Sequence, residues 1–126
     1  MLDAFNLIAF SATENAIRAR YFYLEVLGLT LVSEDEFAIE FSVRGIQLRL
    51  QKVERVNPQP YTLLGWSVTE IDQLVRDLKG RGVLFERFDF LDQDPEGIWT
   101  APHGAKIAWF KDPDGNLLSL TEPPVR

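Results

Sequence analysis

The stretch WFKDPDGNLLSLTE (residues 109–122) predicts a β-hairpin, because two mainly apolar strand candidates flank a tight turn. The turn itself, DPDG, has Asp first, Pro second and Gly fourth, which is typical of a type I turn. The earlier segment EFAIEFSVRGIQLRLQ (residues 36–51) has the same organisation around a turn at Arg44 and Gly45. Each half of the chain therefore carries a hairpin of similar design. Acidic residues 34–36, just before the first hairpin, are predicted to form a solvated turn.

A helix is predicted before each hairpin. Apolar side chains recur at helical spacing from Ala19 to Leu27, and Gly28 ends the pattern. A second apolar helix face runs from Ile71 to Leu78. The candidate N-terminal caps are Thr13 and Asn15 for the first helix, and Thr69 with Asp72, as a capping box, for the second.

Each predicted helix follows an apolar strand candidate, at residues 5–12 and 61–68. We therefore expect an α+β fold of two tandem βαβββ modules within one domain of residues 1–126. Module 1 is expected at about residues 4–53, a linker at about 54–60 and module 2 at about 61–122. Overlaying the copies makes Ile8 equivalent to Leu63 and Arg49 equivalent to Ser119, and leaves residues 89–104 as an insertion in the second copy.

Composition narrows the classes of partner. The chain has 126 residues, about one domain, and its 46% hydrophobic content suffices for a single core. The absence of cysteine excludes disulfides, thiolate zinc sites and a thiol nucleophile. A net charge of −6 without any basic run argues against nucleic acid and against anionic membranes as partners. With no long apolar run and no signal-peptide pattern, we expect a cytoplasmic protein whose partner is a small molecule.

Three segments in order carry a resemblance to a known family: ARYFYLEVLGL (residues 19–29), GWSVTEIDQLVRDLKGRGV (residues 65–83) and WFKDPDGNLLSL (residues 109–120). Together with the internal repeat they resemble the vicinal oxygen chelate superfamily, which contains glyoxalase I, bleomycin-resistance proteins and extradiol dioxygenases. The resemblance covers nearly the whole chain. It implies a sheet-lined cleft, pairing of units between chains as a homodimer and, in many members, one divalent metal.

The resemblance also implies where metal ligands would stand, on the first and last strand of each module. The equivalent positions here are Ile8, Arg49, Leu63 and Ser119. None offers the imidazole or carboxylate that such a metal requires, so we expect neither a metal nor another cofactor. Glu122 is no substitute, because side chains alternate along a strand and Glu122 faces away from Ser119.

The same alternation sorts the strands into a core face and a candidate cleft face. The predicted core comprises Leu48, Leu50, Leu64, Trp66, Val68, Leu118 and Leu120. The candidate ligand-binding residues are Arg49, Gln47, Gln51, Ser119, Phe10, Tyr61, Leu63, Ile8, Trp99 and Trp109. We expect Arg49 to make this face positive and to clamp a carboxylate or phosphate, the alternative being that it lies on a solvated sheet face.

Two functions stay open at this point. One is a metal-free protein that binds a small anionic or aromatic ligand in a dimeric cleft. The other is an enzyme of the glyoxalase (lyase or isomerase) or extradiol dioxygenase type with a non-standard or absent metal site. The catalytic residues of such an enzyme are unknown; His103, the only histidine, is a candidate acid or base if the insertion folds over the cleft, although a loop histidine is more often exposed.

Overall fold

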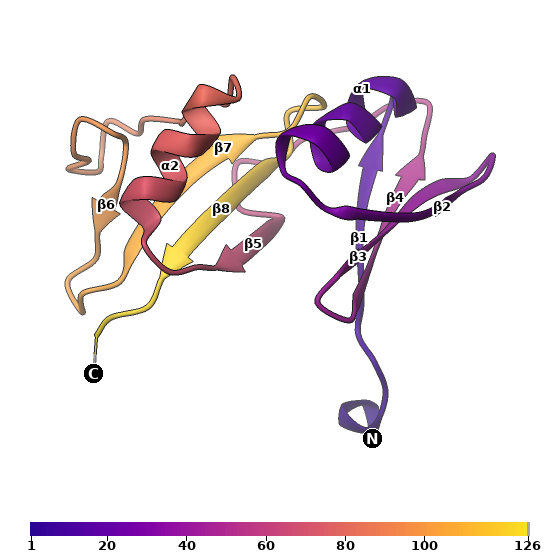
Figure 1. Cartoon of the computed structure of the whole chain (residues 1–126), viewed down its shortest axis with the longest axis horizontal. Helices are drawn as coiled ribbons and strands as arrows, with labels where there is room; N and C mark the ends of the chain where they lie inside the picture. The colour runs from indigo at the N-terminus through magenta and orange to yellow at the C-terminus, as the bar shows by residue number, and fades with distance from the viewer. Residues whose placement is uncertain (126) are drawn as a thin grey trace. The chain divides into compact units, whose positions relative to one another are not determined.

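The computed structural model describes residues 1–125, which form two compact units that meet in sequence between Asn57 and Pro58 (Figure 1). Each unit has its own four-stranded mixed sheet. In each, the order along the chain is strand, helix and then three strands. The expected α+β fold of tandem βαβββ modules is confirmed. No helix in residues 1–125 is long and apolar enough to cross a membrane.

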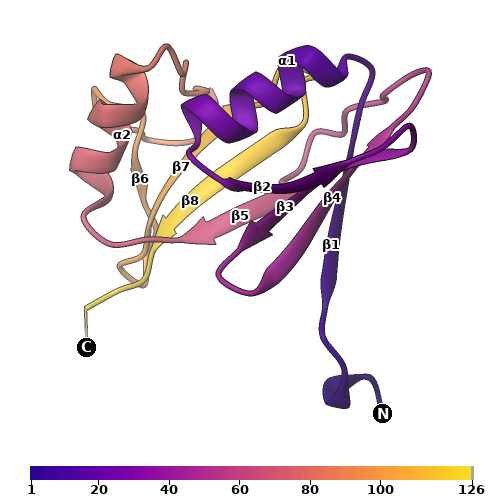
Figure 2. The ribbon, with the colours of Figure 1, turned by 45° about the vertical axis from the view of Figure 1, so that its right-hand side comes forward.

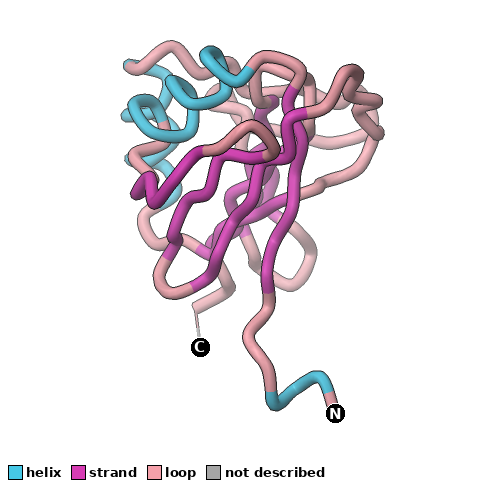
Figure 3. The backbone as a smooth tube through the Cα atoms, turned by 90° about the vertical axis from the view of Figure 1, so that its right-hand side faces the viewer, coloured by secondary structure: helices cyan, strands magenta, loops and turns pink. Residues whose placement is uncertain are grey.

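Unit 1 is built around sheet A, in which the strands lie in the order β1-β4-β3-β2 (Figure 2). Strand β1 is parallel to β4, and the other neighbours are antiparallel. Figure 3 shows the first helical turn, η1, standing clear of the strands at the N-terminal end. The elements are η1 (Leu2–Ala4), β1 (Ile8–Thr13), α1 (Ala16–Tyr21), the π-helical turn η2 (Phe22–Val26), β2 (Thr30–Glu34), β3 (Ala38–Val43) and β4 (Ile46–Lys52).

Unit 2 repeats this arrangement in sheet B, with the strand order β5-β8-β7-β6. Helix α2 packs on β7 and β8, as Figure 1 shows. The elements are β5 (Leu64–Ser67), α2 (Ile71–Gly80), β6 (Trp99–Thr100), β7 (Lys106–Lys111) and β8 (Leu117–Glu122).

The segment that sequence analysis treats as an insertion, residues 89–104, contains one of the module's own strands. Trp99 and Thr100 form β6 and pair with Ile107 and Lys106 of β7. Two paired residues are too few to show the alternation by which a strand is recognised in a sequence. The additional chain in unit 2 therefore surrounds β6, which occupies the place that β2 has in unit 1.

Both predicted hairpin turns are confirmed. Arg44 and Gly45 have φ of 48° and 83° between the antiparallel strands β3 and β4, as a tight primed turn requires. In the second hairpin the amide of Gly115 donates to the Asp112 carbonyl at 2.9 Å, which closes the predicted type I turn. The Asp112 side chain is buried and accepts from the amides of Asp114 and Asn116, so this turn is held rigidly.

The helix caps agree with the sequence in one unit and differ in the other. Asn15 caps α1, since its Oδ1 accepts from the Arg18 amide at 3.2 Å. The capping box predicted for α2 is wrong, because Glu70 holds the cap position with φ of 52° and no side-chain cap bond. Glu122 replaces it, its Oε1 accepting from the Ile71 amide at 2.9 Å. This bond also confirms that Glu122 lies on the helix side of sheet B.

The core of each unit lies between the helix and one sheet face, as the alternation predicts. Leu50 and Leu118 are fully buried, and Leu48 and Leu120 are nearly so. Tyr23 of η2 packs on Phe41 of β3, with ring centroids 5.9 Å apart. The remaining predicted core residues, Leu64, Trp66 and Val68, are only half-buried, since β5 is the edge strand of sheet B.

The acidic segment before the first hairpin is exposed, as predicted, with Asp35 and Glu36 in the turn between β2 and β3, but it also forms specific bonds. Glu34 ends β2 and forms ion pairs with Arg20 of α1 at 2.7 Å and with Lys52 of β4 at 2.8 Å. Hydrogen bonds from Arg20 and then Lys52 lower the pKa of the Glu34 carboxyl to about 2. Asp35 accepts from the amides of Phe37 and Ala38, and these bonds lower its pKa too. Glu34 thus ties the predicted solvated turn to helix α1 and to strand β4.

Candidate functional site

The face of sheet A opposite its helices is the candidate site in unit 1. The strand register places Phe10, Arg49 and Glu40 in one row across β1, β4 and β3. The row beside it holds Ile8 and Gln47. Ile8 is 42% exposed and Phe10 is 48% exposed, so two large apolar side chains remain uncovered on this face. Sheet A therefore offers an apolar wall next to a polar cluster.

Glu40 is the residue that sequence analysis missed on this face. Its Oε1 accepts from Gln47 Nε2 at 2.6 Å and from Arg49 Nη1 at 3.1 Å. The expectation of a positively charged face is wrong, because Glu40 neutralises Arg49 in an ion pair. Counting outward from the turn at residues 44–45 already places Glu40 opposite Arg49, so the signal was present in the sequence.

The geometry of the Arg49–Glu40 pair leaves part of each side chain able to form further hydrogen bonds. Arg49 meets Glu40 through Nη1 alone, and its side chain is 30% exposed. Within residues 1–125 its other guanidinium nitrogens form no hydrogen bond or ion pair, although the charge of Arg49 also acts on the nearby Asp35 carboxylate. All five guanidinium hydrogens lie in one plane, so an anion can bind the open edge in two-point fashion while Glu40 stays in place. Gln51, also predicted here, is exposed one row further along β4.

In unit 2 the residue equivalent to Arg49 is Ser119, and its side chain is shielded from solvent. Ser119 of β8 is only 8% exposed and lies beside Gly65 of β5 in the register. A Cβ on residue 65 would stand 2.7 Å from Ser119 Oγ, so the hydroxyl occupies the space that the glycine leaves. Ser119 is thus packed against a neighbouring strand rather than presented on an open surface.

The aromatic residues predicted for the site do come together on sheet B. The rings of Trp99 and Trp109 have centroids 6.2 Å apart, and both residues are half-buried. Sequence analysis missed Phe88, whose ring meets Trp109 edge to face at 5.4 Å. Phe88 stands in irregular chain before β6, where no periodic pattern points to it.

The other predicted residues of unit 2 lie outside this aromatic group. Tyr61 and Leu63 are 63% and 44% exposed, just before β5. His103 is exposed in the turn between β6 and β7, which a bond from the Gly104 amide to the Ala101 carbonyl closes. Within residues 1–125 the His103 side chain has no hydrogen-bonding or ionic partner, so nothing there orients it as an acid or base.

The comparisons with known proteins agree with this architecture. The family model of the Glyoxalase/Bleomycin resistance protein/Dioxygenase superfamily matches residues 8–120. The chain belongs to this superfamily. Comparison with the curated proteins finds no match.

Solved structures of the superfamily are similar to the chain over nearly its whole length. A member from Sphaerobacter thermophilus has 24% identity and a TM-score of 0.75, covering 98% of this chain and 100% of its own. A glyoxalase/bleomycin resistance protein/dioxygenase from Alicyclobacillus acidocaldarius has 22% identity and a TM-score of 0.71, with 94% and 90% covered. A glyoxalase family protein from Enterococcus faecalis has 22% identity and a TM-score of 0.68, with 93% and 94% covered. At these identities the likeness shows the fold alone.

The divalent metal that superfamily membership suggests does not fit the residues present. Within residues 1–125 no group of three or more His, Asp or Glu side chains is placed to hold a metal ion. On sheet A the one central carboxylate, Glu40, is bound to Arg49, whose positive charge would repel a metal cation. The corresponding part of sheet B holds a buried serine.

Proposed function

We propose that this member of the superfamily is a small-molecule-binding protein that works without a metal. The ligand carries an anionic group beside an apolar or aromatic body, and it binds on the open face of sheet A. One observation carries the proposal: a partly exposed Arg49, held by Glu40 through a single nitrogen, lies in register with the half-exposed ring of Phe10.

Arg49 supplies the anionic half of the proposed site. Because Glu40 fixes the guanidinium plane from one side, the side chain loses less freedom when an anion binds the other edge. The Arg49–Glu40 pair has no net charge, so affinity depends on two-point geometry rather than on long-range attraction. Charge-assisted hydrogen bonds of this kind contribute about 1.5–3 kcal/mol.

Ile8 and Phe10 supply the apolar half. Both side chains are about half exposed on the edge strand β1, with Phe10 in the row that holds Arg49 and Ile8 in the next row. A ligand ring covering them would remove apolar surface from water at roughly 25 cal/mol per Å². We propose that a second copy of the chain closes this face into a dimeric cleft, since a sheet with a helix on one side leaves its other side uncovered.

An enzymatic function of the glyoxalase or dioxygenase type is the second candidate, and Glu40 is the observation in its favour. Its Oε1 is occupied by Gln47 and Arg49, which would position Oε2 toward a bound molecule. A carboxylate oriented next to a cation can accept a proton from a ligand whose resulting negative charge the Arg49 guanidinium stabilises.

A ligand screen in the absence of metal tests the proposed function. Small carboxylic acids, phosphates, and neutral and cationic compounds of similar size are compared by thermal shift on protein purified with a chelator. We expect acids to raise the melting temperature without added metal. Stabilisation by neutral or cationic compounds only, or a requirement for zinc, nickel, manganese or iron, would overturn the proposal. Turnover of a stabilising acid that is lost in Glu40→Gln would favour the enzyme.

A further inference from the structure

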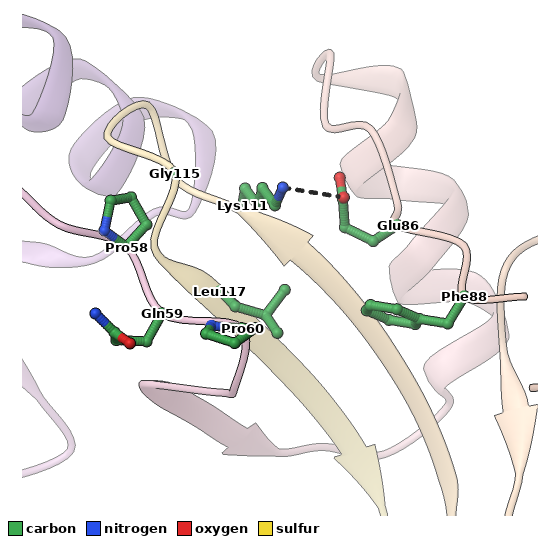
Figure 4. Close-up of a pocket in the computed structure, with 8 residues that line it drawn as sticks. All are labelled: Pro58, Gln59, Pro60, Glu86, Phe88, Lys111, Gly115 and Leu117. Carbon is green, nitrogen blue, oxygen red and sulfur yellow. Dashed lines mark ion pairs between the residues drawn. The ribbon is translucent and has the colours of Figure 1, made fainter. Parts of the chain in front are cut away.

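Unit 2 contains a pocket of about 330 Å³, and the geometry points to a second ligand site there, for a small aromatic carboxylate (Figure 4). Its walls come from the linker, from the chain after α2 and from strands β7 and β8. The lining residues that matter for binding are Pro58, Pro60, Glu86, Phe88, Lys111 and Leu117. All belong to unit 2, whereas the site proposed on sheet A is built from residues of unit 1.

The pocket has a rigid frame. The rigid turn after β7 ends at Gly115, whose φ of 88° favours glycine. A Cβ on residue 115 would lie 3.1 Å from Pro58 Cγ, so the glycine lets the linker pack closely on the turn. A bond of 2.8 Å from the Leu63 amide to the Leu117 carbonyl holds the chain after the linker against β8. A preformed pocket spares a ligand the cost of ordering loops.

One side of the pocket suits a flat apolar body. Figure 4 shows the Phe88 ring and the Leu117 side chain pointing toward one another, with Pro60 beside Leu117. Phe88 is itself supported by the edge-to-face contact with Trp109. The pocket volume is near the lower end of the range for small-molecule sites, about 300–1,000 Å³. These dimensions fit a single aromatic ring.

The other side carries a weakly held cation. Lys111 Nζ lies 3.5 Å from Glu86 Oε1, and the Lys111 side chain is 54% exposed. Exposed pairs of this kind contribute only about 0–1 kcal/mol, so a ligand carboxylate can compete with Glu86 for the ammonium. Because Lys111 and Leu117 are partners in the β7–β8 register, the charge stands directly beside the apolar wall. An aromatic ring and a carboxylate on one small molecule match this combination.

Titration of the ¹⁵N-labelled protein with benzoate, followed by amide chemical shifts, tests the site. We expect saturable shifts centred on residues 86–88 and 111–117. Lys111→Gln is expected to raise the Kd about fivefold or more, and Glu86→Gln to lower it about twofold or more by removing the competing carboxylate. Lys106→Gln is the matched control, since Lys106 lies on the same strand but pairs with Asp72 of α2 at 3.3 Å. Its Kd is expected to stay within about twofold of wild type.

Two further measurements complete the test. Benzamide has the ring without the charge and is expected to bind more weakly than benzoate. Arg49→Ala is expected to leave the shifts in residues 86–117 unchanged, which separates this site from the one on sheet A. Equal benzoate affinity for wild type and Lys111→Gln, equal binding of benzamide, or shifts confined to other residues would overturn the assignment.

Discussion

Replacing Arg49 by alanine is the most direct test of the proposed ligand site on sheet A. The substitution removes the guanidinium and its 3.1 Å bond to Glu40, but leaves Gln47 bonded to Glu40 at 2.6 Å. Arg49 and Glu40 side chains are 30% and 21% exposed, so solvent reaches both. For such a pair we expect a loss of about 0–1 kcal/mol in the free energy of unfolding.

The effect on ligand binding should be larger than the effect on folding. An anion on the open edge of Arg49 loses charge-assisted hydrogen bonds worth about 1.5–3 kcal/mol, equivalent to roughly 10- to 150-fold in Kd. The unpaired Glu40 carboxylate then repels the same anion, which moves the loss toward the upper end of this range. Glu40→Gln should have the opposite sign and strengthen the binding of acids.

The assay is isothermal titration calorimetry with an acid that stabilises the wild type. Arg18→Ala is the matched control, because Arg18 is an exposed arginine of α1 in the same unit and does not belong to the row of Phe10, Arg49 and Glu40. Its Kd is expected to equal that of wild type. Acids that bind Arg49→Ala as tightly as wild type would refute the reasoning and would leave Arg49 as a solvated surface residue.

Four further results are expected. Mass spectrometry of protein purified without chelators should find less than stoichiometric zinc, nickel, manganese or iron, because the donor set does not fit a metal. Light scattering at micromolar concentration should give about twice the chain mass of 14.4 kDa if the open face of sheet A is covered by a second copy. The free energy of unfolding, measured with denaturant, should fall by about 1–2 kcal/mol as the pH falls from about 4.5 to about 2, because the pKa of Glu34 is lower in the folded than in the unfolded chain and solvent screens part of its ion pairs. The Glu34→Gln variant should lose less stability over this range. Gly65→Ala should destabilise unit 2 by about 1 kcal/mol or more through the clash with Ser119 Oγ, and Ser119→Ala in the same chain should relieve it.

Each of these expectations has a clear contrary result. One tightly held metal ion per chain would contradict the inference that the donor side chains do not fit a metal. A mass near that of a single chain would contradict the proposed dimer. An acid-stability profile unchanged by Glu34→Gln would mean that the two ion pairs are too exposed to matter. Equal stability of Gly65→Ala and wild type would show that the Ser119 side chain adopts another rotamer with no loss of stability.

The local features of the fold could be predicted from the sequence, because each depends on residues close together along the chain. The two hairpin turns, the Asn15 cap and the alternation that buries Leu50 and Leu118 all belong to this group. The order of strands and helices follows from the same patterns, except for the two-residue strand β6, which shows no alternation. The Arg49–Glu40 pair was also within reach, since its register follows from the turn between β3 and β4.

Contacts between distant segments were decided only by the tertiary structure. Glu122 caps α2 because β8 lies beside β5 and brings its end to the helix start. Ser119 is closed off because residue 65 of the neighbouring strand is a glycine. The pocket with Phe88 and Lys111 exists because linker, irregular chain and sheet meet at one place. Periodicity within a segment reports which side chains turn inward, whereas the neighbours they meet depend on strand order, and strand order is set by the packing of the whole unit.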